Sequence, residues 1–98
     1  MIMRIWRGWT RPEDAEEYAD YIVGTGLAEY LATPGNRGAH LVSRPDGDRT
    51  EFLTVSLWDS RAAIVAFAGN EIDRAVFYPE DDRYLIAKED TVAHYEVH

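Results

Sequence analysis

The chain has 98 residues, of which 46% are hydrophobic and 29% are charged, and this composition is typical of one globular domain over residues 1–98. It contains no cysteine, which excludes disulfides, zinc–thiolate sites, iron–sulfur clusters and cysteine nucleophiles. It has 10 basic and 18 acidic side chains, and its basic residues are scattered, so we expect no nucleic-acid partner. We find neither an apolar run long enough for a membrane span nor a signal-peptide pattern, and we expect a cytoplasmic protein without membrane contact.

The first third of the chain predicts a strand followed by a helix. Residues 2–9 are rich in β-forming residues and too short and glycine-interrupted for a helix. Thr10 and Glu13 have the spacing of a capping box, in which both side chains satisfy backbone donors at a helix start. Apolar residues then recur at three- and four-residue spacing, which predicts a helix to about residue 31. Gly24 and Gly26 lie inside this helix and predict a bend or a break.

The middle of the chain predicts a β-hairpin and a second helix. Residues 38–44 and 50–58 have strand character, and a turn sequence rich in Pro, Asp and Gly separates them. Asp59 or Ser60 is placed to cap the helix that follows, and Gly69 is placed to end it. We expect a further short helix from Asn70 to Phe77 and a last strand at residues 91–97.

This order, β-α-β-β-α-β, predicts an α+β fold of the ferredoxin-like type. Such a fold has a four-stranded antiparallel sheet with both helices on one face. The strands carry large side chains on both faces, for example Ile5 and Trp6 in the first strand. An uncovered apolar sheet face is larger than soluble monomers usually tolerate, so we expect a homodimer that packs through this face.

The segment around the third predicted strand resembles a known family. Residues 52–60, FLTVSLWDS, followed by residues 62–67, AAIVAF, are similar to the antibiotic biosynthesis monooxygenase domain family, which belongs to the dimeric α/β-barrel superfamily. The resemblance implies a cofactor-independent oxygenase that oxidises a small aromatic or polyphenolic molecule, such as an anthrone, with O2. This chemistry requires a base, a hydrogen-bond donor for the anion that forms, and a dry aromatic slot.

The same family contains haem-degrading members, whose pattern this chain does not follow. That pattern has an Asn in the first strand, a Trp near the end of the second helix, and a His about ten residues later as iron ligand. Residues 1–10 contain no Asn, and Phe67 and Phe77 occupy the other two positions, although Tyr78 next to them is able to ligate iron in principle. We therefore expect neither haem degradation nor a bound cofactor.

Two residues are candidates for catalysis. His40 is the natural general base near neutral pH, and its alternative role is a hydrogen-bonded histidine at a sheet face or dimer seam. Arg83 lies in a loop that is placed to act as a lid and to offer its guanidinium to a phenolic or carboxylated ligand, and its alternative role is a local ion pair. His94 and His98 lie too far apart on a strand to share a metal ion, so we expect no metal site.

Six further residues are expected to contact the small aromatic ligand. Tryptophan stacks well on aromatic ligands but more often packs in cores or dimer interfaces, and an arginine in the first strand can stabilise an anion or reach the solvent. The candidates are Arg4, Trp6, Trp58, Phe67, Tyr78 and Tyr84. Two other functions stay open on the same fold, an isomerase or lyase that uses His40 with an arginine, and a non-catalytic module that binds a small ligand.

Overall fold

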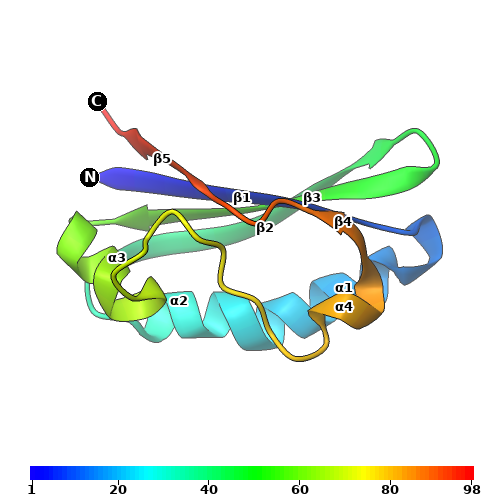
Figure 1. The fold of residues 1–98 in the computed structure, drawn as a ribbon, viewed down its shortest axis with the longest axis horizontal. Helices are drawn as coiled ribbons and strands as arrows, with labels where there is room; N and C mark the ends of the chain where they lie inside the picture. The colour runs from blue at the N-terminus through cyan, green and yellow to red at the C-terminus, as the bar shows by residue number, and fades with distance from the viewer.

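The computed structural model describes residues 1–98 and consists of an antiparallel sheet with all helices on one face (Figure 1). The strands are β1 (Ile2–Thr10), β2 (Asn36–Asp46), β3 (Arg49–Trp58), β4 (Leu85–Lys88) and β5 (Ala93–Glu96). Their order is β2-β3-β1-β4, and β5 also pairs with β1. The expected α+β, ferredoxin-like class is therefore confirmed.

The expected last strand is divided into two short strands that share one edge of β1. β4 pairs with β1 near Thr10, and β5 pairs with β1 near Ile2, so together they occupy the place of the fourth strand. Between them, residues 90–92 leave the edge of β1 and bond instead to residues 73–75. The ends of the chain lie side by side, since the amide of Val97 donates to the carbonyl of Met1 at 3.0 Å (Figure 1).

The first helical region runs from Pro12 to Ala32 without a break. It starts as a 3₁₀ turn (Pro12–Asp14), continues as α1 (Ala15–Ile22), widens into a π-helical segment (Val23–Leu27) and ends as α2 (Ala28–Ala32). Gly24 and Gly26 both lie in the π-helical segment, so the irregularity expected there is a change of helix type. Between them the Thr25 hydroxyl donates to the carbonyl of Tyr21 at 2.7 Å, a bond of the kind that distorts α-helices.

The capping box expected at Thr10 and Glu13 is wrong. Thr10 is the last residue of β1, where it pairs with Thr50 of β3, and its hydroxyl donates to the carbonyl of Arg11. No side chain caps the 3₁₀ turn that follows. Pairing in the sheet holds Thr10 in extended conformation, and this overrides the local helix-start signal.

The second helix, α3 (Arg61–Ala68), is bounded as the sequence predicts. The Ser60 side chain accepts a hydrogen bond from the amide of Ala63 at 3.2 Å and caps the helix start. Gly69 follows the last helical residue with a φ of 84°, a conformation that glycine adopts without steric cost.

The short helix expected from Asn70 to Phe77 is wrong. Residues 70–80, which we call the cover segment, run without regular helix or strand along the gap between the sheet and α1 (Figure 1). The amide of Ala75 donates to Asp90, and the carbonyl of Asp73 accepts from Val92. Because these backbone groups pair with residues 90–92, they are not free to form a helix. One helical turn, α4 (Asp81–Tyr84), follows the cover segment.

The core lies between the helices and the sheet. Alternate residues of β1 and β3 point into it, and those between them form the opposite face of the sheet, which no helix covers (Figure 1). The buried apolar cluster consists of Tyr18, Ile22, Leu27, Tyr30, Phe52, Trp58, Ile64 and Tyr84. None of the helices combines the length and the apolar character that a membrane crossing requires.

Candidate functional site

A cavity lies between the helical side of the sheet, the first helical region and the cover segment. Its volume of about 20 Å³ is enough for one water molecule, so the cavity is nearly closed. Its lining is aromatic and apolar with a few polar groups. The lining residues are Arg4, Trp6, Tyr18, Ile22, Gly26, Tyr30, Thr54, Val76, Phe77, Tyr78, Asp81 and Val92.

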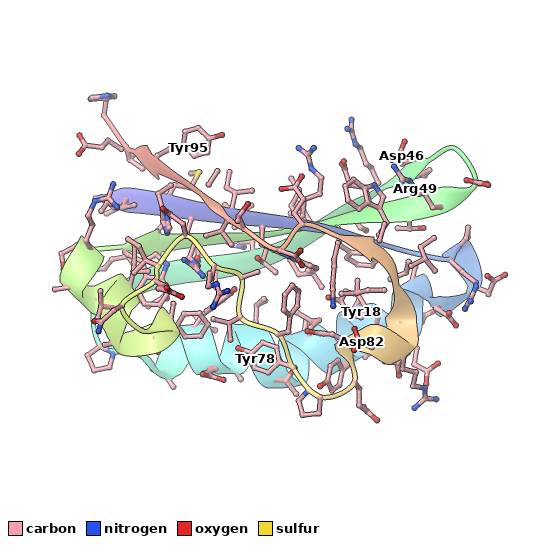
Figure 2. All side chains as sticks on the ribbon, viewed as in Figure 1. Tyr18, Asp46, Arg49, Tyr78, Asp82 and Tyr95 are labelled. Carbon is pink, nitrogen blue, oxygen red and sulfur yellow. The ribbon has the colours of Figure 1, made fainter.

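Aromatic side chains form much of the wall. Trp6 of β1 is fixed by a 2.8 Å hydrogen bond from its Nε1 to the carbonyl of Glu89, and its ring meets Phe77 edge-on at a centroid distance of 6.3 Å. Lys88 Nζ lies 4.3 Å from the centre of the Phe77 ring, which holds this ring by a cation–π contact. Tyr78 lies between the sheet and the helical region near Tyr18 (Figure 2). The result is a slot lined by rings, as aromatic ligands require.

Three lining residues each contribute a buried polar atom that has no hydrogen-bond partner in the protein. These atoms are Arg4 Nε, the Tyr78 hydroxyl and Asp81 Oδ1. A buried polar group without a partner costs roughly 1–3 kcal/mol, so native proteins contain few of them. The residues that line this small cavity thus include one donor, one acceptor and one group that can do both. Such a set is complementary to a polar aromatic ligand.

The other two guanidinium nitrogens of Arg4 hold its side chain on the helical side of the sheet. It is only 2% exposed. Its Nη1 donates to the carbonyl of Ile72, and its Nη2 donates to the carbonyl of Arg74 at 3.0 Å. Burial lowers the pKa of Arg4 from its usual value, although arginine stays charged at neutral pH. A fixed positive charge therefore borders the cavity and also ties the cover segment to β1.

Asp81 supplies the negative group. It begins α4 and is 3% exposed. Its Oδ2 accepts a hydrogen bond from the backbone amide of Tyr78 at 2.7 Å, whereas its Oδ1 has no hydrogen-bond partner. Burial raises the pKa of Asp81, and the amide of Tyr78 and the Lys88 charge only partly oppose this. A carboxylate with a raised pKa is a stronger base than a solvated one.

The cavity tyrosines are held in the protonated form. Burial raises the pKa of Tyr78, and the nearby Glu29 carboxylate adds to the rise. Burial also raises the pKa of Tyr30, although Thr54 and Arg4 act in the opposite direction. Both hydroxyls are therefore available as donors at neutral pH.

The structure brings three of the eight candidate residues to the cavity, namely Arg4, Trp6 and Tyr78. Three others, Trp58, Phe67 and Tyr84, pack in or against the apolar core. Trp58 is completely buried, and its Nε1 donates to the Ser56 hydroxyl. The Phe67 ring packs against both Tyr30 and Trp58, at centroid distances of 4.5 Å and 5.7 Å.

The two residues expected to be catalytic lie outside the cavity. His40 is exposed and pairs in register with Val55, on the sheet face that points away from the helices. The Arg83 side chain is exposed and lies near Glu17 at 3.6 Å and Glu80 at 3.7 Å. The local ion pair that was the alternative for Arg83 is thus what the structure contains.

Nine cavity residues are absent from the candidates drawn from the sequence, among them Tyr18, Gly26, Tyr30 and Asp81. Tyr30 belongs to the apolar helical pattern, which indicates burial but no ligand. Asp81 belongs to the loop from which only Tyr78, Arg83 and Tyr84 were chosen as candidates. Three acidic residues lie between Tyr78 and Tyr84, and no signal in the sequence distinguishes Asp81 from its neighbours Glu80 and Asp82.

Comparison with known proteins links this fold to one enzyme family. The model of the family "antibiotic biosynthesis monooxygenase" matches residues 1–76. A structure from Nitrosomonas europaea assigned to these enzymes aligns with a TM-score of 0.69 at 14% identity, covering 99% of this chain and 98% of its own. A further antibiotic biosynthesis monooxygenase aligns with a TM-score of 0.65 at 16% identity, covering 100% and 99% of the two chains. No curated protein matches the chain in sequence.

A haem degrader also shares the fold. MhuD of Mycobacterium tuberculosis, solved with two haems in its active site, aligns with a TM-score of 0.59 at 19% identity, covering 99% of this chain and 95% of its own. The cavity described here does not fit a haem. No histidine lines it, and the three lining tyrosines, Tyr18, Tyr30 and Tyr78, have pKa values raised by burial, which disfavours the phenolate form that binds iron. No group of three or more His, Asp or Glu side chains is placed to hold a metal ion.

Proposed function

Because the chain belongs to the antibiotic biosynthesis monooxygenase family, we propose that it oxidises a small phenolic aromatic molecule with O2 and without a bound cofactor. The observation that carries the proposal is that Arg4, Tyr78 and Asp81 line one aromatic cavity and that each has a buried polar atom without a partner, namely Arg4 Nε, the Tyr78 hydroxyl and Asp81 Oδ1. These residues offer the base and the anion-stabilising donors that the chemistry needs, and the aromatic cavity offers the dry slot.

The proposed reaction starts with a proton transfer. Asp81 Oδ1 takes a proton from the substrate, and Arg4 Nε and the Tyr78 hydroxyl donate hydrogen bonds to the oxygen on which negative charge develops. The substrate anion passes one electron to O2, and the two radicals combine into a peroxide anion. Asp81 returns its proton to this anion, which becomes a hydroperoxide. The hydroperoxide then loses water and leaves a carbonyl group. One oxygen atom of O2 enters the product and the other leaves as water, so atoms and electrons balance.

Binding of such a substrate requires the cover segment to move. A cavity of about 20 Å³ does not admit a bicyclic molecule. Residues 70–80 form one side of the cavity and have no regular secondary structure of their own. Segments of this kind open at a low free-energy cost compared with core helices and strands. We therefore place ligand entry at this segment, which shares only residues 78–80 with the loop around Arg83 that the sequence suggested as a lid.

A homodimer through the open sheet face is part of the proposal. This face carries Ile5, Val42, Val55 and Tyr95, and Tyr95 extends from β5 on the side away from the helices (Figure 2). Val42 is 45% exposed and Tyr95 is 56% exposed. Light scattering after size exclusion tests this part, and Val42→Lys is expected to shift the protein toward the monomer. A wild-type protein that elutes as a monomer at high concentration would contradict it.

The proposed activity is tested by oxygen uptake with metal-stripped protein and a panel of anthrones, naphthols and hydroquinones. We expect uptake that depends on the protein and falls by roughly 10² or more in Asp81→Asn, as for loss of a general base. Asp82→Asn is the matched control, because the Asp82 side chain in α4 is 89% exposed and does not line the cavity, although it pairs with Lys88 at 2.9 Å. Equal uptake by the Asp81 variant would refute the role of this residue. Conversion of substrate without oxygen uptake would favour an isomerase or lyase in the same cavity.

A further inference from the structure

Behind the cavity, three side chains form a continuous chain of polar contacts. Asp73 of the cover segment lies with its Oδ1 3.2 Å from His94 Nδ1, and His94 Nε2 lies 3.0 Å from Arg4 Nη1. The His94 side chain is 4% exposed, while Asp73 is open to solvent. His94 belongs to β5 and Arg4 to β1, and the two residues pair in register.

This geometry determines the protonation of His94. An arginine only donates hydrogen bonds, so His94 Nε2 must accept the bond from Arg4 Nη1 with its lone pair. The proton of a neutral imidazole then sits on Nδ1, where it donates to Asp73. A protonated His94 would direct a second donor at Arg4 Nη1 and could not keep this contact.

The contact also determines the orientation of Arg4. The guanidinium is planar and rigid, so holding two of its nitrogens fixes the direction of the third. Nη1 is held by His94 and by the carbonyl of Ile72, and Nη2 is held by the carbonyl of Arg74. The third nitrogen, Nε, is the one without a partner, and Arg4 lines the cavity.

We infer that His94, oriented by Asp73, is a positioning residue that holds the Arg4 guanidinium in place for the ligand only while His94 is neutral. The inference rests on the proposed function for the identity of the ligand, but not for the geometry. The charged groups that act on His94 are Arg4 from β1, Asp73 from the cover segment and Arg61 from α3. Burial and the Arg4 charge lower the pKa of His94 below its usual value, and Asp73 only partly opposes this.

The sign of the pH effect follows from this shift. His94 is neutral at pH 7 and becomes protonated only as the pH falls below the usual histidine pKa of about 6.5. Arg4 then loses one of the contacts that orient it and that hold the cover segment through Ile72 and Arg74. Ligand affinity and turnover should therefore be full above this pH and fall in acid.

The first experiment is NMR of the His94 side-chain nitrogens in the free protein. We expect a neutral ring with the proton on Nδ1 at pH 7 and a pKa below about 6.5, and Asp73→Asn should lower this pKa further. A ring that carries its proton on Nε2, or one that is charged at pH 7, would overturn the inference whatever the protein catalyses. Failure of the proposed function, in contrast, would leave this spectrum unchanged.

The second experiment measures the pH profile of function in two variants. In His94→Gln the side-chain oxygen can still accept from Arg4 but does not titrate. We therefore expect near-normal function at pH 7 and a smaller acid limb, in which only the protonation of Asp81 still lowers turnover. In His94→Ala the acceptor is lost, and kcat/KM should fall by about tenfold to a hundredfold at every pH, the cost of a misplaced group. His98→Gln is the matched control, since His98 lies at the exposed end of the chain and contacts none of these groups.

The same comparison can be made by ligand binding if the oxygen-uptake panel shows no turnover. The dissociation constant of 1-naphthol, measured by calorimetry between pH 5 and pH 8, then replaces kcat/KM. We expect His94→Gln to bind about as tightly as the wild type at pH 7 and His94→Ala to bind more weakly at every pH. An unchanged acid limb in His94→Gln would overturn the inference, and so would full function of His94→Ala at all pH values.

Discussion

Replacing Tyr78 by Phe should make the free protein more stable while it weakens ligand binding. The Tyr78 hydroxyl is buried and has no partner in the protein, so folding removes it from water without replacing its hydrogen bonds. The ring itself packs against Gly26, and this contact does not involve the hydroxyl. Phe keeps the packing and removes only the unpaired group.

The size of the effect follows from the cost of a buried hydroxyl without a partner, about 1–3 kcal/mol. We expect Tyr78→Phe to raise the free energy of unfolding by the lower part of this range, about 1–2 kcal/mol. For a domain of this length each kcal/mol raises Tm by about 4–8 °C. The affinity for a phenolic ligand should fall about fivefold or more, the equivalent of one lost hydrogen bond.

Urea unfolding followed by tryptophan fluorescence measures the free energy, and calorimetry with 1-naphthol measures the affinity. Tyr95→Phe is the matched control, because Tyr95 extends from the opposite side of the sheet and does not line the cavity (Figure 2). A Tyr78→Phe protein that is less stable than the wild type would refute the reasoning, since its hydroxyl would then make a hydrogen bond in the free protein.

Three further predictions concern the same region. An added Cβ at Gly26 would lie 3.2 Å from the Tyr78 ring, so Gly26→Ala should displace Tyr78 and weaken naphthol binding. At Gly24 an added Cβ would meet no atom within 4 Å other than those of adjacent residues and of the helix backbone. Gly24→Ala should therefore stabilise the helical region by up to about 1 kcal/mol in urea unfolding. Burial raises the pKa of Asp81, so the stability that its protonated form contributes is lost as the pH rises through that pKa. At pH 7, Asp81→Asn should therefore unfold at a higher urea concentration than the wild type. An equal urea midpoint would argue against a desolvated carboxylate at this position. Turnover in His40→Ala should stay within about twofold of wild type, in contrast to the roughly 10²-fold loss expected of a general base, and a loss of that size would restore the role drawn from the sequence.

The fold was predictable because its elements are encoded by short-range patterns. Alternation in residues 50–58, the turn before it, and the Ser60 and Gly69 signals around α3 each act within a few residues. The cover segment was not predictable in this way. Its backbone groups are taken by Arg4 and by residues 90–92, which lie far away in the sequence. Asn70 and Asp73 have the local character of a helix start, but long-range bonds decide their structure.

The site was predictable only in part, for a related reason. Odd spacing places Arg4 and Arg7 on opposite faces of β1, but nothing local says which face the helices cover. In the same way, the sequence does not say which of two alternate sets of residues in β2 faces the helices, and His40 belongs to the set that faces away from them. Trp58 and Phe67 were reasonable ligand contacts by residue type. They pack with Tyr30 instead, because the end of α3 lies over that part of the sheet.

The central position of β1 has a consequence for how the protein comes together during synthesis. β1 precedes the other strands in the sequence, yet one of its two edges is completed only by β4 and β5, such that Ile2 pairs with Glu96. These contacts close the longest loops of the sheet, and topologies of this kind fold slowly for their size. Until β5 has been synthesised, the edge of β1 that pairs with β5 stays open and able to pair with other extended chains. During synthesis this sheet is thus most prone to aggregation after β1 and β3 have been made and before β5 has been made.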